Sequence, residues 1–323
     1  MTHNELASCA DWLRDARWGV FTHYLESPAS STRPGTTSAD AWNRRVDAFD
    51  VEALARQLAS VGAAYYGITI GQNSGHYCAP NATYDAIVGR RPSLCSRRDL
   101  IADLHAALEP RGIRLLAYLP GGAPACDALA VEKFEWQAGN HRLAAFQRKW
   151  EAVIREWSLR WGPKVSAWWI DGCFHADAMY RHEEAPNWAS LTAALKAGNR
   201  ASIVAYNPGG CCVPIARHSP YEDYTAGELT NDLPVGTWGN RGPWLHTPIE
   251  ASVEGAQYHV LNFLGEWWGQ GEPRFPDELI VGYTRYLNRH GGVVTWDVPI
   301  GNNGRIPAAY IRQLRKIDRR TAR

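Results

Sequence analysis

Eight short apolar runs recur along the chain and alternate with segments of helical periodicity, and this alternation strongly restricts the possible folds. Nearly continuous apolarity is typical of parallel strands that are buried on both faces. The runs lie at residues 18–24, 63–70, 113–119, 165–171, 202–207, weakly near Tyr221, 258–264 and 292–298. Eight strands alternating with helices predict an α/β fold, a (β/α)₈ TIM-like barrel in a single domain spanning residues 1–323.

The helical segments between the runs are bounded by capping and stop residues. Asp50 can cap a helix that continues to Val61, and Ser96-x-x-Asp99 resembles a capping box before a helix that stops at Pro110. Further helices are predicted at 143–161, 188–196 and 277–289. A doubly wound open sheet is the main alternative, but no strand leads into a glycine-rich phosphate loop.

Charge and composition exclude several function classes. The 323 residues carry a formal net charge of only +1, which disfavours a nucleic-acid or anionic-membrane partner. No signal peptide and no run long enough to span a membrane is evident, so we expect a cytoplasmic protein. The 15 tryptophans are unusual and suit a site that binds flat apolar surfaces.

Seven cysteines without regular spacing, including adjacent Cys211 and Cys212, predict reduced thiols. A zinc site could be drawn from cysteines and histidines along the chain, but their spacing matches no known ligand pattern; the candidates are Cys173, His175, His76 and Cys78. We therefore expect neither a metal nor another cofactor.

Polar side chains at the carboxyl ends of the predicted strands are the candidates for chemistry, because active sites of barrels lie there. They are His23, Gln72, Asn73, His76, Tyr118, Asp171, Asn207, Glu222, Asp223 and Glu228. Asp171 ends an apolar run, and no clear helix follows it to be capped. Glycoside hydrolysis needs a pair of carboxylates, and the segment 221–228 offers a second one from another strand end.

Four stretches, in order along the chain, resemble the α-L-fucosidases of glycoside hydrolase family 29. Residues 11–23 (DWLRDARWGVFTH) are similar to the family's opening motif, and Trp169-Ile-Asp-Gly172 to its W-x-D-G strand end. Residues 223–228 (DYTAGE) and 291–307 (GGVVTWDVPIGNNGRIP) resemble its acid/base segment and its closing motif. The family has a (β/α)₈-like catalytic domain and a retaining mechanism, and many members carry a C-terminal β-sandwich that we do not expect here.

The resemblance implies a retaining exo-glycosidase that cleaves a terminal α-L-fucosyl or related sugar. The resemblance places Asp171 at the position of the family's nucleophile and His23 at that of a sugar-binding histidine. It places Glu228 at the position of the acid/base, with Glu222 and Asp223 as alternatives. Further substrate-binding residues are expected among strand-end polar and aromatic side chains: Trp42, Gln72, Asn73, His76, Tyr118, Trp169, Asn207 and Trp296. Trp168 is a further candidate for packing against the sugar. The expected partner is a carbohydrate, and the oligomeric state is left open.

Departures from the family pattern leave other hypotheses open. Gln72 and Asn73 stand where the family has two sugar-binding histidines, and Ala41 replaces a glutamate. Amides hydrogen-bond with other lengths and do not titrate, so altered specificity, for example for an α-L-galactoside, is one alternative. A barrel that binds sugar without catalysis is a second. A metal-dependent barrel enzyme is a third, built on His23, His76 and His175.

Overall fold

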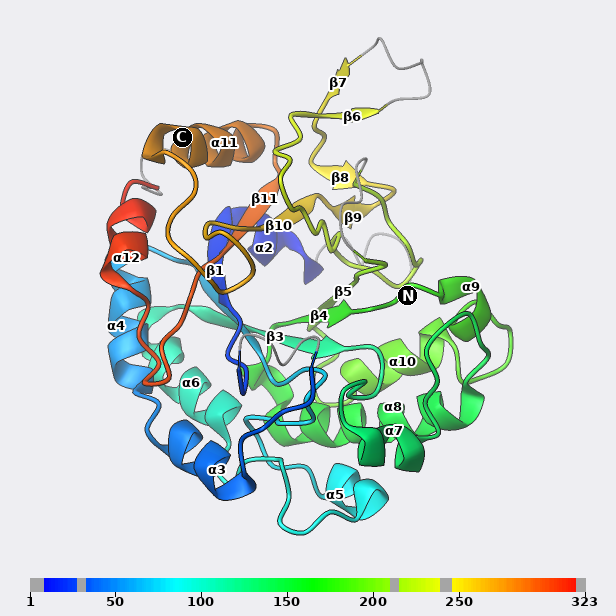
Figure 1. The fold of residues 1–323 in the computed structure, drawn as a ribbon. Helices are drawn as coiled ribbons and strands as arrows, with labels where there is room; N and C mark the ends of the chain where they lie inside the picture. Colours follow the sequence, from blue (N-terminus) through cyan, green and yellow to red (C-terminus); the bar gives the residue numbers. More distant parts are fainter. Residues whose placement is uncertain (1–8, 28–32, 210–214, 239–245, 318–323) are drawn as a thin grey trace.

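The computed structural model describes residues 9–27, 33–209, 215–238 and 246–317 (Figure 1). A parallel sheet of seven strands, in the order β10-β11-β1-β2-β3-β4-β5, forms its centre. Its members are β1 (Trp18–Thr22), β2 (Tyr65–Thr69), β3 (Arg114–Pro120), β4 (Ala167–Asp171), β5 (Ile203–Tyr206), β10 (His259–Phe263) and β11 (Val293–Asp297). Each falls on one of the apolar runs, so the predicted parallel α/β architecture is confirmed.

Alternation along the strands divides the core into two clusters. On β3, Leu116 and Tyr118 join an inner cluster, whereas Leu115 and Ala117 join the cluster between the sheet and the helices. This is the period-2 alternation of a strand in a curled sheet, with one set of side chains inside and the other outside.

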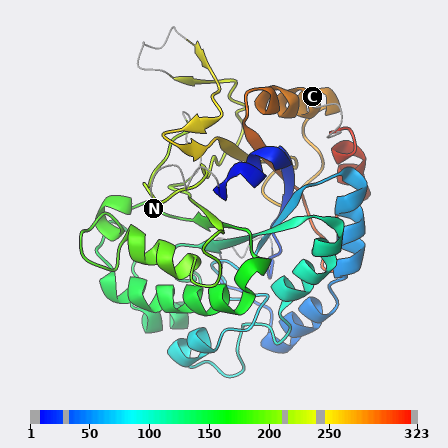
Figure 2. The same cartoon turned by 180° about the vertical axis from the view of Figure 1, so that it is seen from behind.

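Helices surround the outer side of the sheet, as Figures 1 and 2 show from opposite sides. They are α3 (Ala39–Asp47), α4 (Val51–Val61), α5 (Ala82–Val88), α6 (Leu100–Leu108), α7 (Ala128–Phe134), α8 (Ala144–Trp161), α9 (Ala176–Met179), α10 (Trp188–Leu195), α11 (Asp277–Arg289) and α12 (Ala308–Leu314), with short 3₁₀ turns at Glu109–Arg111 and Gly162–Lys164. The short helix α2 (Asp11–Ala16), which precedes β1, instead places its buried Leu13 and Ala16 in the inner cluster.

Helix caps agree with the sequence in one case and differ in another. Asp50 accepts a hydrogen bond from the Ala53 amide at 2.9 Å and begins α4 as predicted. The predicted capping box of Ser96 and Asp99 is wrong. Asp99 is itself the N-cap of α6 and accepts from the Ala102 amide, because its short carboxylate reaches that amide directly, while Ser96 donates to a nearby carbonyl.

The sheet curls until β5 and β10 face each other, and residues 223–229 fill the seam between them. The Asp223 amide donates to the carbonyl of Val204 in β5, and the Leu229 amide donates to the carbonyl of Leu261 in β10, both at 2.9 Å. Two isolated parallel bridges, rather than a continuous ladder, hold this segment beside β10. Glu228 pairs with Leu261 of β10, and Tyr224 pairs with Gln257, which lies just before β10.

The weak eighth strand expected near Tyr221 is therefore an irregular segment in the described chain. Gly227 explains this, since its φ of 59° interrupts the extended backbone. A Cβ at Gly227 would lie 2.0 Å from the carbonyl oxygen of His259, so only glycine permits this approach to β10. After the seam come two small hairpins, β6 (Gly236–Trp238) with β7 (His246–Pro248) and β8 (Ser252–Val253) with β9 (Ala256–Gln257).

Candidate active site

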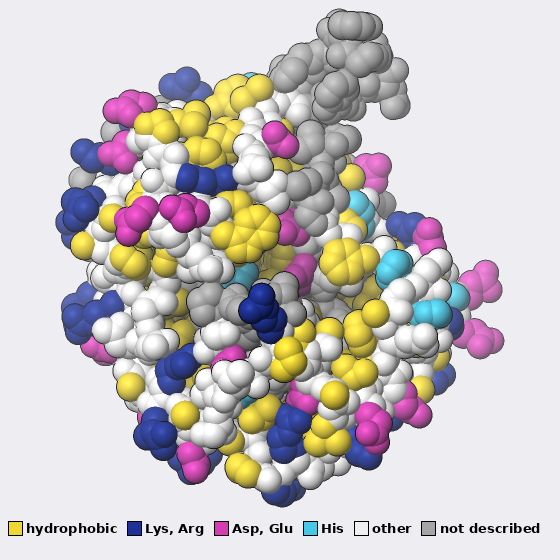
Figure 3. Space-filling view, viewed as in Figure 1, with side chains coloured by type: hydrophobic (Ala, Val, Ile, Leu, Met, Phe, Trp, Pro, Cys, Tyr) yellow, Lys and Arg dark blue, Asp and Glu magenta, His cyan; other side chains and the backbone are white. Residues whose placement is uncertain are grey.

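A cavity of about 610 Å³ opens at the carboxyl ends of the strands. Figure 3 shows a hollow near the centre of this face, with acidic and histidine side chains visible inside it. Carboxylates, amides and aromatic rings make up most of its lining, together with a few aliphatic and other residues. The lining residues are His23, Tyr24, Leu25, Glu26, Ser27, Arg45, Gln72, Asn73, Tyr118, Trp169, Asp171, Phe174, Glu228, Leu261, Trp267, Trp268, Gly269, Gln270, Ile300 and Asn302. This position is the one that barrel enzymes use.

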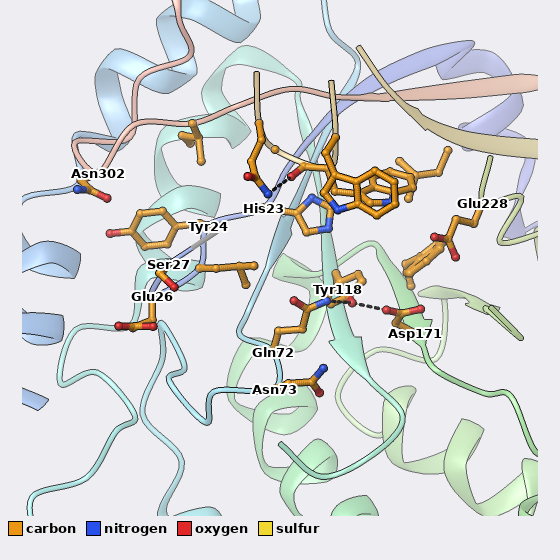
Figure 4. Close-up of a pocket in the computed structure, with 18 of the residues that line it drawn as sticks. His23, Tyr24, Glu26, Ser27, Gln72, Asn73, Tyr118, Asp171, Glu228 and Asn302 are labelled. Carbon is orange, nitrogen blue, oxygen red and sulfur yellow. Dashed lines mark hydrogen bonds between the residues drawn. The ribbon is translucent and has the colours of Figure 1, made fainter. Parts of the chain in front are cut away.

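Asp171 is the last residue of β4 and has three hydrogen-bond donors around its carboxylate. Oδ1 accepts from the Gly172 amide and from Asn207 Nδ2, each at 2.8 Å. Oδ2 accepts from the hydroxyl of Tyr118 at 2.5 Å (Figure 4). Both oxygens thus act as acceptors, and the three donors fix the position of the carboxyl group.

Glu228 faces Asp171 from the seam segment, and the amide of Asn207 contacts both. Asn207 Nδ2 donates to Glu228 Oε2 at 2.5 Å as well as to Asp171 Oδ1 at 2.8 Å. The two carboxylate oxygens share this nitrogen, so they can be no more than about 5.3 Å apart. This upper limit lies below the roughly 6.5–9.5 Å between the carboxyl groups of inverting glycosidases and is compatible with the roughly 5–5.5 Å of retaining ones.

Burial and a neighbouring negative charge act on the carboxyl group of Glu228. Burial, followed by the negative charge of Asp171, raises the pKa of Glu228 to about 7, against the hydrogen bond from Asn207 and the nearby His23, which lower it. At neutral pH a large share of Glu228 is therefore protonated and can donate a proton. A pair of carboxyl groups with different environments is the usual basis for separate acid and nucleophile roles.

Gln72 and Tyr118 form a hydrogen-bond chain that ends on Asp171. Because the single proton of the Tyr118 hydroxyl goes to Asp171, the tyrosine oxygen must accept from Gln72 Nε2, at 2.7 Å. This fixes the orientation of the Gln72 amide. Its Oε1 is then the free end, buried and without a hydrogen-bond partner among the described residues.

His23 follows β1 and is oriented by a buried acid. Its Nδ1 lies 2.9 Å from Oδ1 of Asp297, the last residue of β11, and the Gly269 amide donates to Oδ2 of Asp297 at 2.6 Å. Burial raises the pKa of Asp297, and the neighbouring His23 opposes this rise. The carboxylate fixes which ring nitrogen faces it, so the opposite nitrogen is the one available to a ligand.

Most of the predicted site residues come together in this cavity. Asn73 lines it, and Trp169 lines it with its ring stacked on Tyr118 at 5.3 Å between centroids. Asn207 is buried behind the two carboxylates that it joins.

Four predicted contacts lie elsewhere. Trp296 is on the outer face of β11, where alternation places Asp297 inside, and its indole donates to Thr284 of α11. Trp168 likewise faces the helices. Trp42 of α3 is buried and donates to the carbonyl of Tyr77, and His76 packs edge-on against it, so neither lines the cavity.

The alternative acids Glu222 and Asp223 are buried outside the cavity. Glu222 accepts from the backbone amides of Tyr206, His218 and Ser219, and burial raises its pKa to about 7. Asp223 forms an ion pair with Lys196 at 2.7 Å. These contacts hold backbone segments together, and Glu228 is the acid of this loop that lines the cavity.

Several residues of the site were not anticipated, although some carried a signal. Asp297, which is buried behind His23 rather than lining the cavity, ends an apolar strand just as Asp171 does. Trp267 and Trp268 form an adjacent pair in the loop after β10, and Trp268 packs 5.6 Å from the ring of His23. Phe174 and Arg45 had no distinguishing pattern in the sequence.

The zinc hypothesis finds no support, since no group of three potential ligands gathers among the described residues. Within the same ranges Cys9, Cys78, Cys95, Cys126 and Cys173 are free thiols, whereas Cys211 and Cys212 lie outside them. None of the described helices is both long and apolar enough to cross a membrane.

Comparison with known proteins shows a likeness of fold. No family model and no curated protein matches the sequence. Among solved structures, the endo-fucoidan hydrolase MfFcnA4 from glycoside hydrolase family 107 has a TM-score of 0.70 at 16% identity, over 96% of this chain and 53% of that one. The chain thus spans about half the length of that protein.

Two further solved structures match this chain over nearly the whole length of both proteins. A second family 107 endo-fucoidan hydrolase, P5AFcnA, has a TM-score of 0.64 at 15% identity, over 96% of this chain and 92% of that one. A mutant of the α-L-fucosidase AlfC, in complex with 4-nitrophenyl-α-L-fucopyranoside, has a TM-score of 0.63 at 13% identity, over 96% and 97%. At these identities the likeness establishes the TIM-barrel-like fold.

Proposed function

We propose that the protein is a retaining glycoside hydrolase that cleaves a terminal α-L-fucosyl or closely related sugar by double displacement. The observation that carries the proposal is the shared donor Asn207, which keeps one oxygen of Asp171 and one of Glu228 within about 5.3 Å of each other, closer than the carboxyl groups of an inverting pair. The resemblance to family 29 motifs and the fold shared with an α-L-fucosidase and endo-fucoidan hydrolases support the sugar class.

In the first step Asp171 attacks the anomeric carbon as the glycosidic C–O bond breaks, and the proton of Glu228 passes to the departing oxygen. In the second step a water molecule attacks the same carbon and gives a proton to Glu228, and the bond to Asp171 breaks. The sugar is released with its original anomeric configuration, and both carboxyl groups return to their starting states.

The lining of the cavity supports a hexose as the bound ring. His23, Gln72 and Asn73 offer polar groups to hydroxyls, and Trp169 and Trp268 offer apolar faces. The amides in place of the family's histidines favour a specificity different from plain fucose, with an α-L-galactoside as the main alternative, because buried polar groups discriminate strongly among hydroxyl patterns.

The decisive experiment is a panel of nitrophenyl glycosides with the anomer of the product followed by NMR. Hydrolysis of the α-L-fucoside or α-L-galactoside with retention supports the proposal, and an inverted product refutes double displacement. If calorimetry detects sugar binding but no member of the panel is hydrolysed, the protein is a sugar-binding module instead.

A further inference from the structure

Two aromatic side chains at the cavity are exposed to solvent although they line it. Phe174 is 62% exposed and Trp267 is 53% exposed, whereas Trp169 in the cavity wall is 3% exposed. Burying large aromatic rings is favourable, so rings that remain accessible beside a cavity are available to an apolar surface of a ligand.

Both exposed rings pack against neighbouring parts of the chain on one side. The ring of Phe174 lies directly on Gly209, where a Cβ would come within 2.3 Å of Phe174 Cε1. Trp267 belongs to a tight turn closed by backbone hydrogen bonds with Gln270, and its ring packs 5.5 Å from that of Phe263. These contacts restrict the two rings before any ligand binds, which lowers the entropic cost of binding.

The order of elements around the barrel places the two rings on either side of Glu228. Phe174 comes from the loop after β4, and Trp267 from the loop after β10. Glu228 belongs to the seam segment that lies between β5 and β10 and pairs with Leu261 of β10. A leaving group that takes its proton from Glu228 must therefore sit in the sector that these rings bracket.

We propose that Phe174 and Trp267 form a leaving-group subsite that stacks against the ring of a second sugar, so that the natural substrate is an oligosaccharide or glycan rather than a glycoside of a small alcohol. This inference rests on the proposed function. The apolar C–H face of a pyranose matches an aromatic ring, and sugar hydroxyls at its edge stay in contact with water at the open side of the cavity.

The test compares two substrates with the same terminal sugar, a disaccharide and a glycosyl fluoride, because fluoride has no ring to stack. Phe174→Ala and Trp267→Ala should each lower kcat/KM for the disaccharide by roughly tenfold, mainly through KM, and leave the fluoride unchanged. Phe174→Tyr keeps a ring and should retain disaccharide activity. Leu159→Ala, a change at an exposed apolar side chain of α8, is the matched control.

Unchanged fluoride hydrolysis also shows that each variant is folded. Equal losses on both substrates, or disaccharide activity equal to that of Leu159→Ala, overturn the subsite while the proposed function stands. A wild-type protein that hydrolyses none of a panel of glycosyl fluorides overturns the proposed function, and the leaving-group subsite with it.

Discussion

A single amide nitrogen, Nδ2 of Asn207, sets the spacing of the two acids on which the proposed chemistry depends. Its two hydrogens point to different carboxylates, so neither acid can move without losing a bond to the same group. The amide also favours the charged form of Glu228 and thereby limits how far burial raises its pKa.

At this scale the nucleophile can be tested directly. Asp171→Ala should reduce turnover of an aryl glycoside by at least about 10³-fold, because the covalent intermediate can no longer form. Added azide should restore product as a glycosyl azide of inverted configuration, measured by NMR. Near wild-type turnover by this variant would show that Asp171 is not the nucleophile.

The proposed role of Glu228 as general acid predicts how kcat/KM depends on pH. A general acid must be protonated, so kcat/KM should fall as pH rises through about 7, the pKa to which burial and the Asp171 charge raise Glu228. Glu228→Gln should remove this alkaline limb and lower the rate by roughly 10²–10⁴-fold on a substrate with a poor leaving group. An alkaline limb that persists in the variant assigns it to another residue.

At the scale of the elements, the buried side chain of Glu222 connects the loop before the seam to β5 through hydrogen bonds. Glu222→Gln should lower the free energy of unfolding by about 1–3 kcal/mol, because an amide NH₂ cannot accept from the backbone amides that the carboxylate satisfies. Urea denaturation measures this. Glu184→Gln, at an exposed position, should have no effect, and equal stability of the two variants would contradict the assigned role.

How far the sequence predicts the elements depends on how local their signals are. Strands β1 to β5, β10 and β11 and helices such as α4 and α11 follow from apolar runs and periodicity, which are local properties. Trp296 was misplaced because its facing depends on the strand register, and alternation turns it toward the helices while its neighbour Asp297 points to the cavity residue His23. The shared donor role of Asn207 arises only when β4, β5 and the seam meet.

Over the whole molecule, closure of the barrel depends on a segment without a regular ladder. Lys196, which follows α10, pairs with Asp223 at the start of this seam, and Asp223 also accepts from the Val204 amide of β5. An ion pair thus fastens the outer helical layer to the point where the sheet closes. Breaking it would leave a buried carboxylate without its cation.

Lys196→Met should lower the free energy of unfolding by about 3–5 kcal/mol at neutral pH. Burial already raises the pKa of Asp223 and Lys196 opposes this rise, so the pKa should climb further in the variant. The penalty applies above that pKa and is relieved as pH falls through it, so the loss should be smaller at about pH 5 than at about pH 8.

Urea titrations at both pH values measure this effect. Lys133→Met, which removes an exposed lysine paired with Glu132, is the control and should change stability little. A loss for Lys196→Met that does not depend on pH would show that packing of the lysine stem, rather than its charge, stabilises the seam.

The hydrogen bonds from Gln72 to Tyr118 and from Tyr118 to Asp171 run in one direction. This direction leaves an acceptor at the Gln72 end, which can pair with a sugar hydroxyl only if the hydroxyl donates its hydrogen. Gln72 Oε1 is buried in the cavity wall and can only accept, so a sugar hydroxyl that reaches it must donate its hydrogen, and an ether oxygen at the same place has none to give. A histidine could exchange donor and acceptor roles by changing its tautomer, but this amide cannot. We therefore expect the protein to discriminate against O-methylated forms of its sugar, even where the cavity has room for the methyl group.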